Sequence, residues 1–194
     1  MNSLNLTAAN PAATICPPPA GPPDDSRPDF RVWLYWELSD AQLSDIYHTA
    51  RRENVLEQVA FDAPVNEECF LLFARRVEVF GACFDPDGRP AGFFYLTNFE
   101  GSTARIHFCL FEAGHACRAT IGGRVLDWCF EVFEFKALIG IIPSTNTGAI
   151  GFARKMGGRE IARIPGFCWI EKLKRSVSGV QFIFERSDCH GRNV

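Results

Sequence analysis

The pattern that most constrains the fold of this chain lies between residues 104 and 158. It reads as a strand, a glycine-containing turn at 118–123, a helix at 120–135, a strand at 137–142 and a short helix capped by Asn146. The strand at 137–142 shows no polar alternation, which is typical of a strand buried on both faces. A turn that opens into a helix leaves backbone N–H groups without partners inside that helix. We therefore expect this unit to form a site for an anion such as a pyrophosphate.

Alternation and turn signals place the other elements around this unit. Residues 30–37 alternate apolar and polar side chains and predict a strand. A capping box, with Ser39 as N-cap and Gln42 at the third helical position, predicts a helix directly after it. A second helix is expected at 66–76, and turn residues at 85–88 predict a hairpin. The remaining strands are expected at 77–84, 91–99, 103–112, 159–164 and 180–185.

The length of 194 residues suits one well-buried domain. Residues 1–28 are rich in Pro, Ala and polar residues, and their proline runs favour polyproline II over a helix or a central strand. We therefore divide the chain into a Pro-rich N-terminal tail at 1–28 and a single domain at 29–194.

Charge and hydropathy exclude two classes of partner. The net charge of -3 and the pI near 5.8 argue against non-specific binding to nucleic acid, which requires a basic surface. No apolar run reaches the roughly 18 residues of a membrane span.

The eight cysteines include no C-x-x-C pair and most lie in apolar segments, which favours free thiols in a reducing cytoplasm. The N-terminus also lacks the pattern of a secretory signal.

Three segments together carry a resemblance to a known family. They are DGRPAGFFYL at 87–96, RATIGG at 118–123 and NTGAIGFARKMGG at 146–158. With the element order, they make residues 39–186 resemble the GNAT (Gcn5-related N-acetyltransferase) superfamily. The third segment is similar to the family's N-x-x-A-x-x-F-Y-x-K-x-G-F motif through Asn146, Ala149, Phe152, Lys155 and Gly157.

The resemblance implies a fold, a co-substrate and a set of binding residues. The implied fold is α/β, with about seven mostly antiparallel strands, helices on both faces and a V-shaped cleft between strands four and five. The implied activity is direct transfer of an acetyl group from acetyl-coenzyme A (acetyl-CoA) to an amine in a ternary complex, with no metal. The residues implied to bind the coenzyme are Cys109, Leu110 and Phe111 through their backbone, Arg118, Ala119, Thr120, Ile121, Gly122 and Gly123 around the pyrophosphate, and Asn146 and Phe152.

Two positions depart from the family's pattern. Ile121 replaces the inner glycine of the family's Q/R-x-x-G-x-G/A turn, and a one-residue shift would let Gly122 take its place. Ala153 occupies the position of the tyrosine that often protonates the departing thiolate, so that proton would come from water or from Cys117.

An attacking amine must lose a proton, so a general base is expected near the cleft. His107 is the first candidate, because it lies on the strand expected to edge the cleft and imidazole titrates near neutral pH. Glu112 and His115 are the alternatives. The alternative is a purely structural role, in which His107 only forms a hydrogen bond with a neighbouring strand. The grouping of Cys109, His115 and Cys117 matches no familiar metal-site spacing.

Two rival functions stay open beside the acetyltransferase. Ile121 and Ala153 favour a catalytically degenerate relative that binds coenzyme A as a sensor or assembly part. Trp33 and Tyr35, with the Pro-rich arm, favour an interaction protein, and a homodimer is possible. The acceptor stays open between a peptide amine and a small-molecule amine such as a polyamine or an aminoglycoside.

Overall fold

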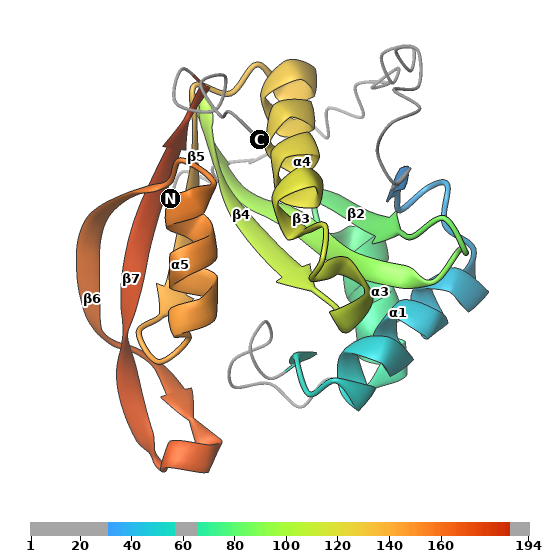
Figure 1. Ribbon diagram of the computed structural model, residues 1–194, viewed down its shortest axis with the longest axis horizontal. Coiled ribbons are helices and arrows are strands. Elements are labelled where there is room, and N and C mark those ends of the chain that lie inside the picture. Colours follow the sequence, from blue (N-terminus) through green and yellow to red (C-terminus); the bar gives the residue numbers. More distant parts are fainter. Residues whose placement is uncertain (1–30, 57–65, 187–194) are drawn as a thin grey trace, which may run out of the picture.

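The computed structural model describes residues 31–56 and 66–186, so the predicted tail at 1–28 lies outside the described residues. Seven strands form one sheet in the order β1-β2-β3-β4-β5-β7-β6 (Figure 1). The strands are β1 Arg31–Leu34, β2 Val79–Phe84, β3 Pro90–Glu100, β4 Thr103–Leu110, β5 Ala137–Pro143, β6 Arg159–Ile170 and β7 Arg175–Glu185. The α-helices are α1 Asp40–Arg52, α3 Glu67–Arg76, α4 Arg118–Phe133 and α5 Thr147–Lys155, and short 3-10 turns occupy Glu112–Gly114 and Glu171–Leu173.

The strand directions confirm the predicted mixed, mostly antiparallel sheet. β4 and β5 run parallel, and the other neighbouring pairs among the described strands are antiparallel. A parallel pair needs a crossover connection, and α4 supplies it. The predicted βαβ unit is therefore present at the centre of the sheet.

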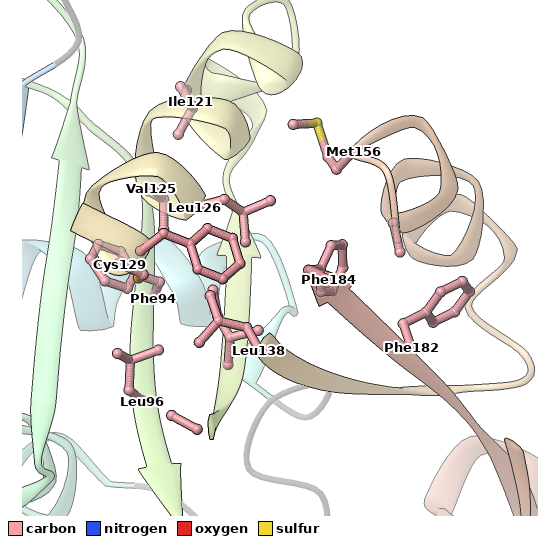
Figure 2. Close-up of a cluster of buried hydrophobic side chains, with 14 of the residues drawn as sticks. Phe94, Leu96, Ile121, Val125, Leu126, Cys129, Leu138, Met156, Phe182 and Phe184 are labelled. Atoms are coloured by element: carbon pink, nitrogen blue, oxygen red, sulfur yellow. The ribbon is translucent and has the colours of Figure 1, made fainter. Parts of the chain in front are cut away.

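Helices cover both faces of the sheet, as predicted. α4 and α5 lie over one face, where Phe94, Leu138 and Phe182 join their apolar side chains in one core cluster (Figures 1 and 2). α1 and α3 pack on the other face, where Phe80 and Phe93 stack at a centroid distance of 5.6 Å. Apolar burial on both faces is the main stabilising term of such a layered domain.

Local sequence signals set several of the element ends. Ser39 and Gln42 form the predicted capping box at the start of α1. Asn66 caps α3, because its side chain accepts a hydrogen bond from the N–H of Cys69 at 2.8 Å. The predicted hairpin turn is closed by the side chain of Asp85, which accepts from the N–H of Arg89 at 2.8 Å, and by Gly88 at φ 81°.

Three predicted boundaries were wrong. The strand expected at 30–37 ends at Leu34, because the chain turns there and the N–H of Glu37 donates to the carbonyl of Leu34. The connection between the last two strands is mostly strand, since β6 continues to Ile170 and β7 begins at Arg175. The turn expected at 118–123 is helical, because α4 begins at Arg118 rather than at 120.

Candidate active site

A split between β4 and β5 confirms the predicted V-shaped cleft. The two strands pair only at Thr103 with Ala137, Ala104 with Leu138, and Arg105 with Ile139. Beyond Arg105 they diverge, and a cavity of about 420 Å³ opens between them. The residues of β4 after Arg105 therefore do not pair with β5. An unpaired strand edge beside a cavity can accept an extended ligand through main-chain hydrogen bonds.

The cavity reaches both faces of the sheet through this split. Phe108, Phe152 and Val125 line it on the face covered by α4 and α5. His107, Cys109 and Val55 line it from the side of α1 and α3, where Cys109 belongs to the other core cluster. One ligand can therefore enter from the side of α4 while a second approaches from the side of α1.

The N-terminus of α4 supplies the anion-binding groups at the outer end of the cavity. The first hydrogen bond of the helix joins the N–H of Ile121 to the carbonyl of Cys117 at 3.0 Å. The N–H groups of Arg118, Ala119 and Thr120 lie before it and have no partner within the helix. Arg118 is exposed and lines the cavity beside His115. This end of the cavity suits a phosphate group through both charge and N–H donors.

The side chain of Ile121 is 1% exposed and belongs to the core between α4 and the sheet (Figure 2). The open side of Gly122 faces α5. A Cβ built on Gly122 would lie 2.6 Å from Cζ of Phe152. Gly122 therefore allows α4 and α5 to approach each other, and it lines the cavity at that contact, whereas Gly123 does not line it.

Asn146 and Phe152 lie on the α5 side of the cavity. The side chain of Asn146 accepts a hydrogen bond from the N–H of Ala149 at 3.0 Å, which caps the helix as predicted. The ring of Phe152 stacks on that of Phe108 across the cavity, with a centroid distance of 5.8 Å and an interplanar angle of 13°. Both predicted residues therefore line the cavity.

The predicted backbone group on β4 lies only partly in the cavity. Cys109 and Leu110 line it, but Phe111 does not, and its side chain is buried between the sheet and α1. The N–H of Phe111 donates to the carbonyl of Ala91 at 3.0 Å. That N–H is therefore already used in the sheet, which leaves Cys109 and Leu110 as the backbone positions facing the split.

His107 lines the cavity and is held in a fixed orientation. Its ring stacks on Tyr95 at a centroid distance of 4.2 Å and an interplanar angle of 7°, and Nε2 lies 3.4 Å from the hydroxyl of Thr97. Burial, together with the charge of Arg105, lowers the pKa of His107 to about 4. The ring is therefore neutral and only weakly basic at pH 7.

The two alternative bases lie differently. Glu112 is exposed and does not line the cavity, and its N–H donates to Oε2 of Glu53 at 2.8 Å. His115 lines the cavity at its exposed, outer end. The geometry thus separates Glu112 from the other two candidates.

Glu53 at the end of α1 and Cys109 are neighbours that the sequence did not connect. Burial, with the charge of Glu53, raises the pKa of the Cys109 thiol to about 12. Glu53 and Val55 come near β4 only because α1 packs on this face of the sheet, and no local motif marks them. The half-buried carboxylate of Glu53 thus lies close enough to Cys109 to shift its pKa, although Glu53 does not itself line the cavity.

The described residues that line the cavity include no side chain with a hydroxyl group. Ala153, at the position of the family's tyrosine, is one of these residues. Within 31–56 and 66–186, no group of three or more His, Cys, Asp or Glu side chains could hold a metal ion. In the same residues, no helix is long and apolar enough to cross a membrane.

The fold of this chain is similar to that of solved acetyltransferase structures. Spermidine N-acetyltransferase from Vibrio cholerae, in a structure with CoA and spermine, matches with a TM-score of 0.70 at 14% identity, over 84% of this chain and 98% of that one. An acetyltransferase of the GNAT family from Bacillus anthracis matches with a TM-score of 0.65 at 12% identity, over 83% and 98% of the two chains. No family model and no curated protein matches the sequence.

Proposed function

Because this chain has the fold of the GNAT superfamily, we propose that it is an N-acyltransferase that transfers an acetyl group, or a related acyl group, from coenzyme A to an amine. The observation that carries the proposal is the cavity through the β4–β5 split, which joins the N-terminus of α4 to the face covered by α1. This geometry supports an elongated phosphate-bearing donor on one side and an acceptor on the other. The acyl group would pass directly from donor to acceptor in a ternary complex. We also propose that the protein is cytoplasmic.

The donor's pyrophosphate is assigned to the first turn of α4. Arg118 supplies positive charge, and the N–H groups of Arg118, Ala119 and Thr120 supply donors. The pantetheine arm would follow the split, with Cys109 and Leu110 of β4 on one side and the side chains of α5 on the other. Asn146 and Phe152 would contact the arm from the other side. Ile121 and Gly123 would act by shaping the helix rather than by touching the ligand.

The acceptor amine would approach from the side of α1, past Val55 and Glu53. Its nitrogen forms a bond to the thioester carbonyl carbon, the carbon–sulfur bond breaks, and the amine loses one proton while the sulfur gains one. Glu53 would bind the ammonium form, and His107 would face the reacting centre. The Vibrio cholerae enzyme has been crystallised with spermine, which supports a small-molecule amine as the first class to test.

His107 remains the candidate base, and its low pKa predicts how the rate should depend on pH. A group with a pKa of about 4 is deprotonated throughout the working range, but it accepts a proton weakly. If His107 is the base, the acid limb of the rate profile lies near pH 4. If the amine must lose its proton to solvent first, the limb lies near the pKa of the amine. Wild-type turnover in His107→Ala would exclude the role.

The experiment that tests the function has two parts. Calorimetric titration of the chain with acetyl-CoA measures binding, and thiol release with a panel of amines measures turnover. Binding and turnover support the acyltransferase. Binding without turnover on any amine would support the second candidate, a catalytically degenerate CoA-binding protein. Ala153 and the low pKa of His107 favour that candidate, because Ala153 offers no hydroxyl to protonate the thiolate and His107 accepts a proton only weakly. Absence of binding at millimolar ligand would contradict both.

A further inference from the structure

The inner end of the cavity is lined by buried apolar side chains. We call it the inner chamber and define it by Ile106, Val125, Leu126, Ala153, Met156 and Phe184. Each of these six side chains is 9% exposed or less, although each lines the cavity. Leu126, Met156 and Phe184 come from three elements and converge on the same space (Figure 2). None of the six side chains carries a hydrogen-bonding N–H or O–H group, so the chamber suits a hydrocarbon.

The inner chamber lies at the closed apex of the split. Ile106 directly follows Arg105, the last residue of β4 that pairs with β5. Arg118 and Asn146 lie at the other end, since α4 and α5 both begin at the open side and run back toward the apex. A chain that enters past Arg118 therefore reaches the inner chamber with its far end, beyond the point where it is held by its phosphates.

Two small residues give the inner chamber its room. Ala153 contributes only a methyl group from α5. Gly140 contributes no side chain from β5, and a Cβ built there would lie 3.5 Å from Phe184 and 3.9 Å from the carbonyl oxygen of Ile106. Those are ordinary contact distances, so the site has space for additional carbon without displacing its neighbours.

We propose that the inner chamber holds the acyl chain of the donor, and that the preferred donor is an acyl-CoA longer than acetyl, of the butyryl to hexanoyl class. The inference rests on the proposed function and names its donor. The transfer is unchanged in kind, since the amine nitrogen replaces sulfur on the acyl carbon and one proton passes from nitrogen to sulfur. The acyl chain beyond the carbonyl lies between α4, α5 and β7.

The experiment compares ligands that differ only in the acyl group. The full chain is titrated with CoA, acetyl-CoA, butyryl-CoA and hexanoyl-CoA, and the Kd of each is measured without an acceptor. Each buried methylene is expected to tighten binding about fourfold. Butyryl-CoA, with two more methylenes than acetyl-CoA, should therefore bind roughly fifteenfold more tightly.

Two variants fill the chamber to different degrees. Ala153→Phe adds a ring, and Gly140→Ala adds one methyl group that the structure accommodates. Ala153→Phe should remove most of the gain for hexanoyl-CoA, and Gly140→Ala should reduce that gain by roughly fourfold, the contribution of one methylene. The Kd of acetyl-CoA should change less than about threefold in both variants. Gly151→Ala is the matched control, because Gly151 lies on the exposed side of α5 with nothing within 4 Å of an added Cβ. Thermal denaturation of each variant checks folding, and Gly140→Ala keeps the test valid if Ala153→Phe does not fold.

The possible outcomes distinguish a failure of the acyl chamber from a failure of the proposed function. A gain with chain length that both filling variants reduce supports the acyl chamber. Equal binding of acetyl-CoA and butyryl-CoA by the wild type overturns it and leaves the proposed acyltransferase intact. A gain that Gly140→Ala and Ala153→Phe both leave unchanged also overturns it, since the acyl chain then lies elsewhere. No binding of any CoA compound overturns the proposed function and this inference with it.

Discussion

Gly122 in α4 lies directly against the ring of Phe152 in α5. A Cβ at position 122 would come within 2.6 Å of Cζ of Phe152 and within 3.4 Å of the sulfur of Met156. Real side chains do not approach so closely, so the two helices meet at a point where only glycine fits without displacing the ring. This contact closes the space between α4 and α5 beside the cavity.

Gly122→Ala is expected to show two opposing effects. Alanine in a helix interior is favoured over glycine by about 1 kcal/mol, but overpacking costs about 1–3 kcal/mol. The wild-type background should therefore show a loss of up to about 2 kcal/mol in the free energy of unfolding. In a Phe152→Ala background the clash disappears, and the same change should stabilise by about 1 kcal/mol. Urea denaturation of the four proteins measures both values.

The control for this cycle is Gly151→Ala, which adds a methyl group on the exposed side of α5. It should stabilise the chain by about 0.4–1 kcal/mol in both backgrounds. If Gly122→Ala has the same sign with and without the Phe152 ring, the two residues are not coupled as the geometry states.

Arg118→Gln is expected to weaken binding of CoA and of acetyl-CoA by about tenfold or more. A hydrogen bond to a charged group contributes about 1.5–3 kcal/mol, and the helix N–H groups keep the rest of the affinity. The Kd should also become less sensitive to salt, since one charge is lost. Arg76→Gln, on the exposed end of α3, is the control and should leave the Kd unchanged. Equal effects of the two changes would contradict an anion site at α4.

The order of the elements could be predicted because its signals are local. The capping box at Ser39 and the Asn146 cap each depend on residues three or four positions apart, and both were found as expected. The start of α4 was missed by two residues for the same reason. Its N-cap Cys117 makes no side-chain capping bond, so the sequence gives no signal at that position.

The site itself could be predicted only in outline. His107 and Arg118 were identified from the strand and helix that carry them, and both line the cavity. Gly140, Val55 and Met156 line it as well, but they meet only when β4 and β5 diverge and α5 packs back on α4. Tertiary packing brings these residues together, and residue spacing within one element does not encode it.

Cys109 is expected to react slowly with a thiol reagent although it lines the cavity. Only the thiolate reacts, and burial, with the charge of Glu53, raises the pKa of Cys109 to about 12. Cys69 is exposed at the start of α3 and should be labelled first, by a factor of about ten or more. Peptide mapping by mass spectrometry after short labelling times resolves the two sites. Equal labelling of Cys69 and Cys109 at pH 7.5 would show that the cavity admits water and base freely at this position.

His107 should make the stability of the protein depend on pH between about 6.5 and 4. Its pKa falls from 6.5 to about 4 on folding, because the ring is buried and faces Arg105. In this window the unfolded chain binds a proton that the folded chain does not bind, so stability falls as pH falls. The loss approaches about 1.4 kcal/mol per pH unit, or about 3 kcal/mol in total from this residue.

His107→Phe removes the titrating group and keeps a ring to stack on Tyr95. Urea denaturation at pH 7 and pH 4.5 should therefore show a difference in unfolding free energy that is about 2 kcal/mol smaller in the variant. His48→Asn is the control, because His48 is exposed on α1 with its Nε2 3.4 Å from Glu67, outside the cavity. If the difference is as large in His107→Phe as in the wild type, the pKa of His107 is not lowered on folding. His107 would then be protonated below about pH 6.5 and could not act as a base there, so the same measurement constrains the catalytic proposal.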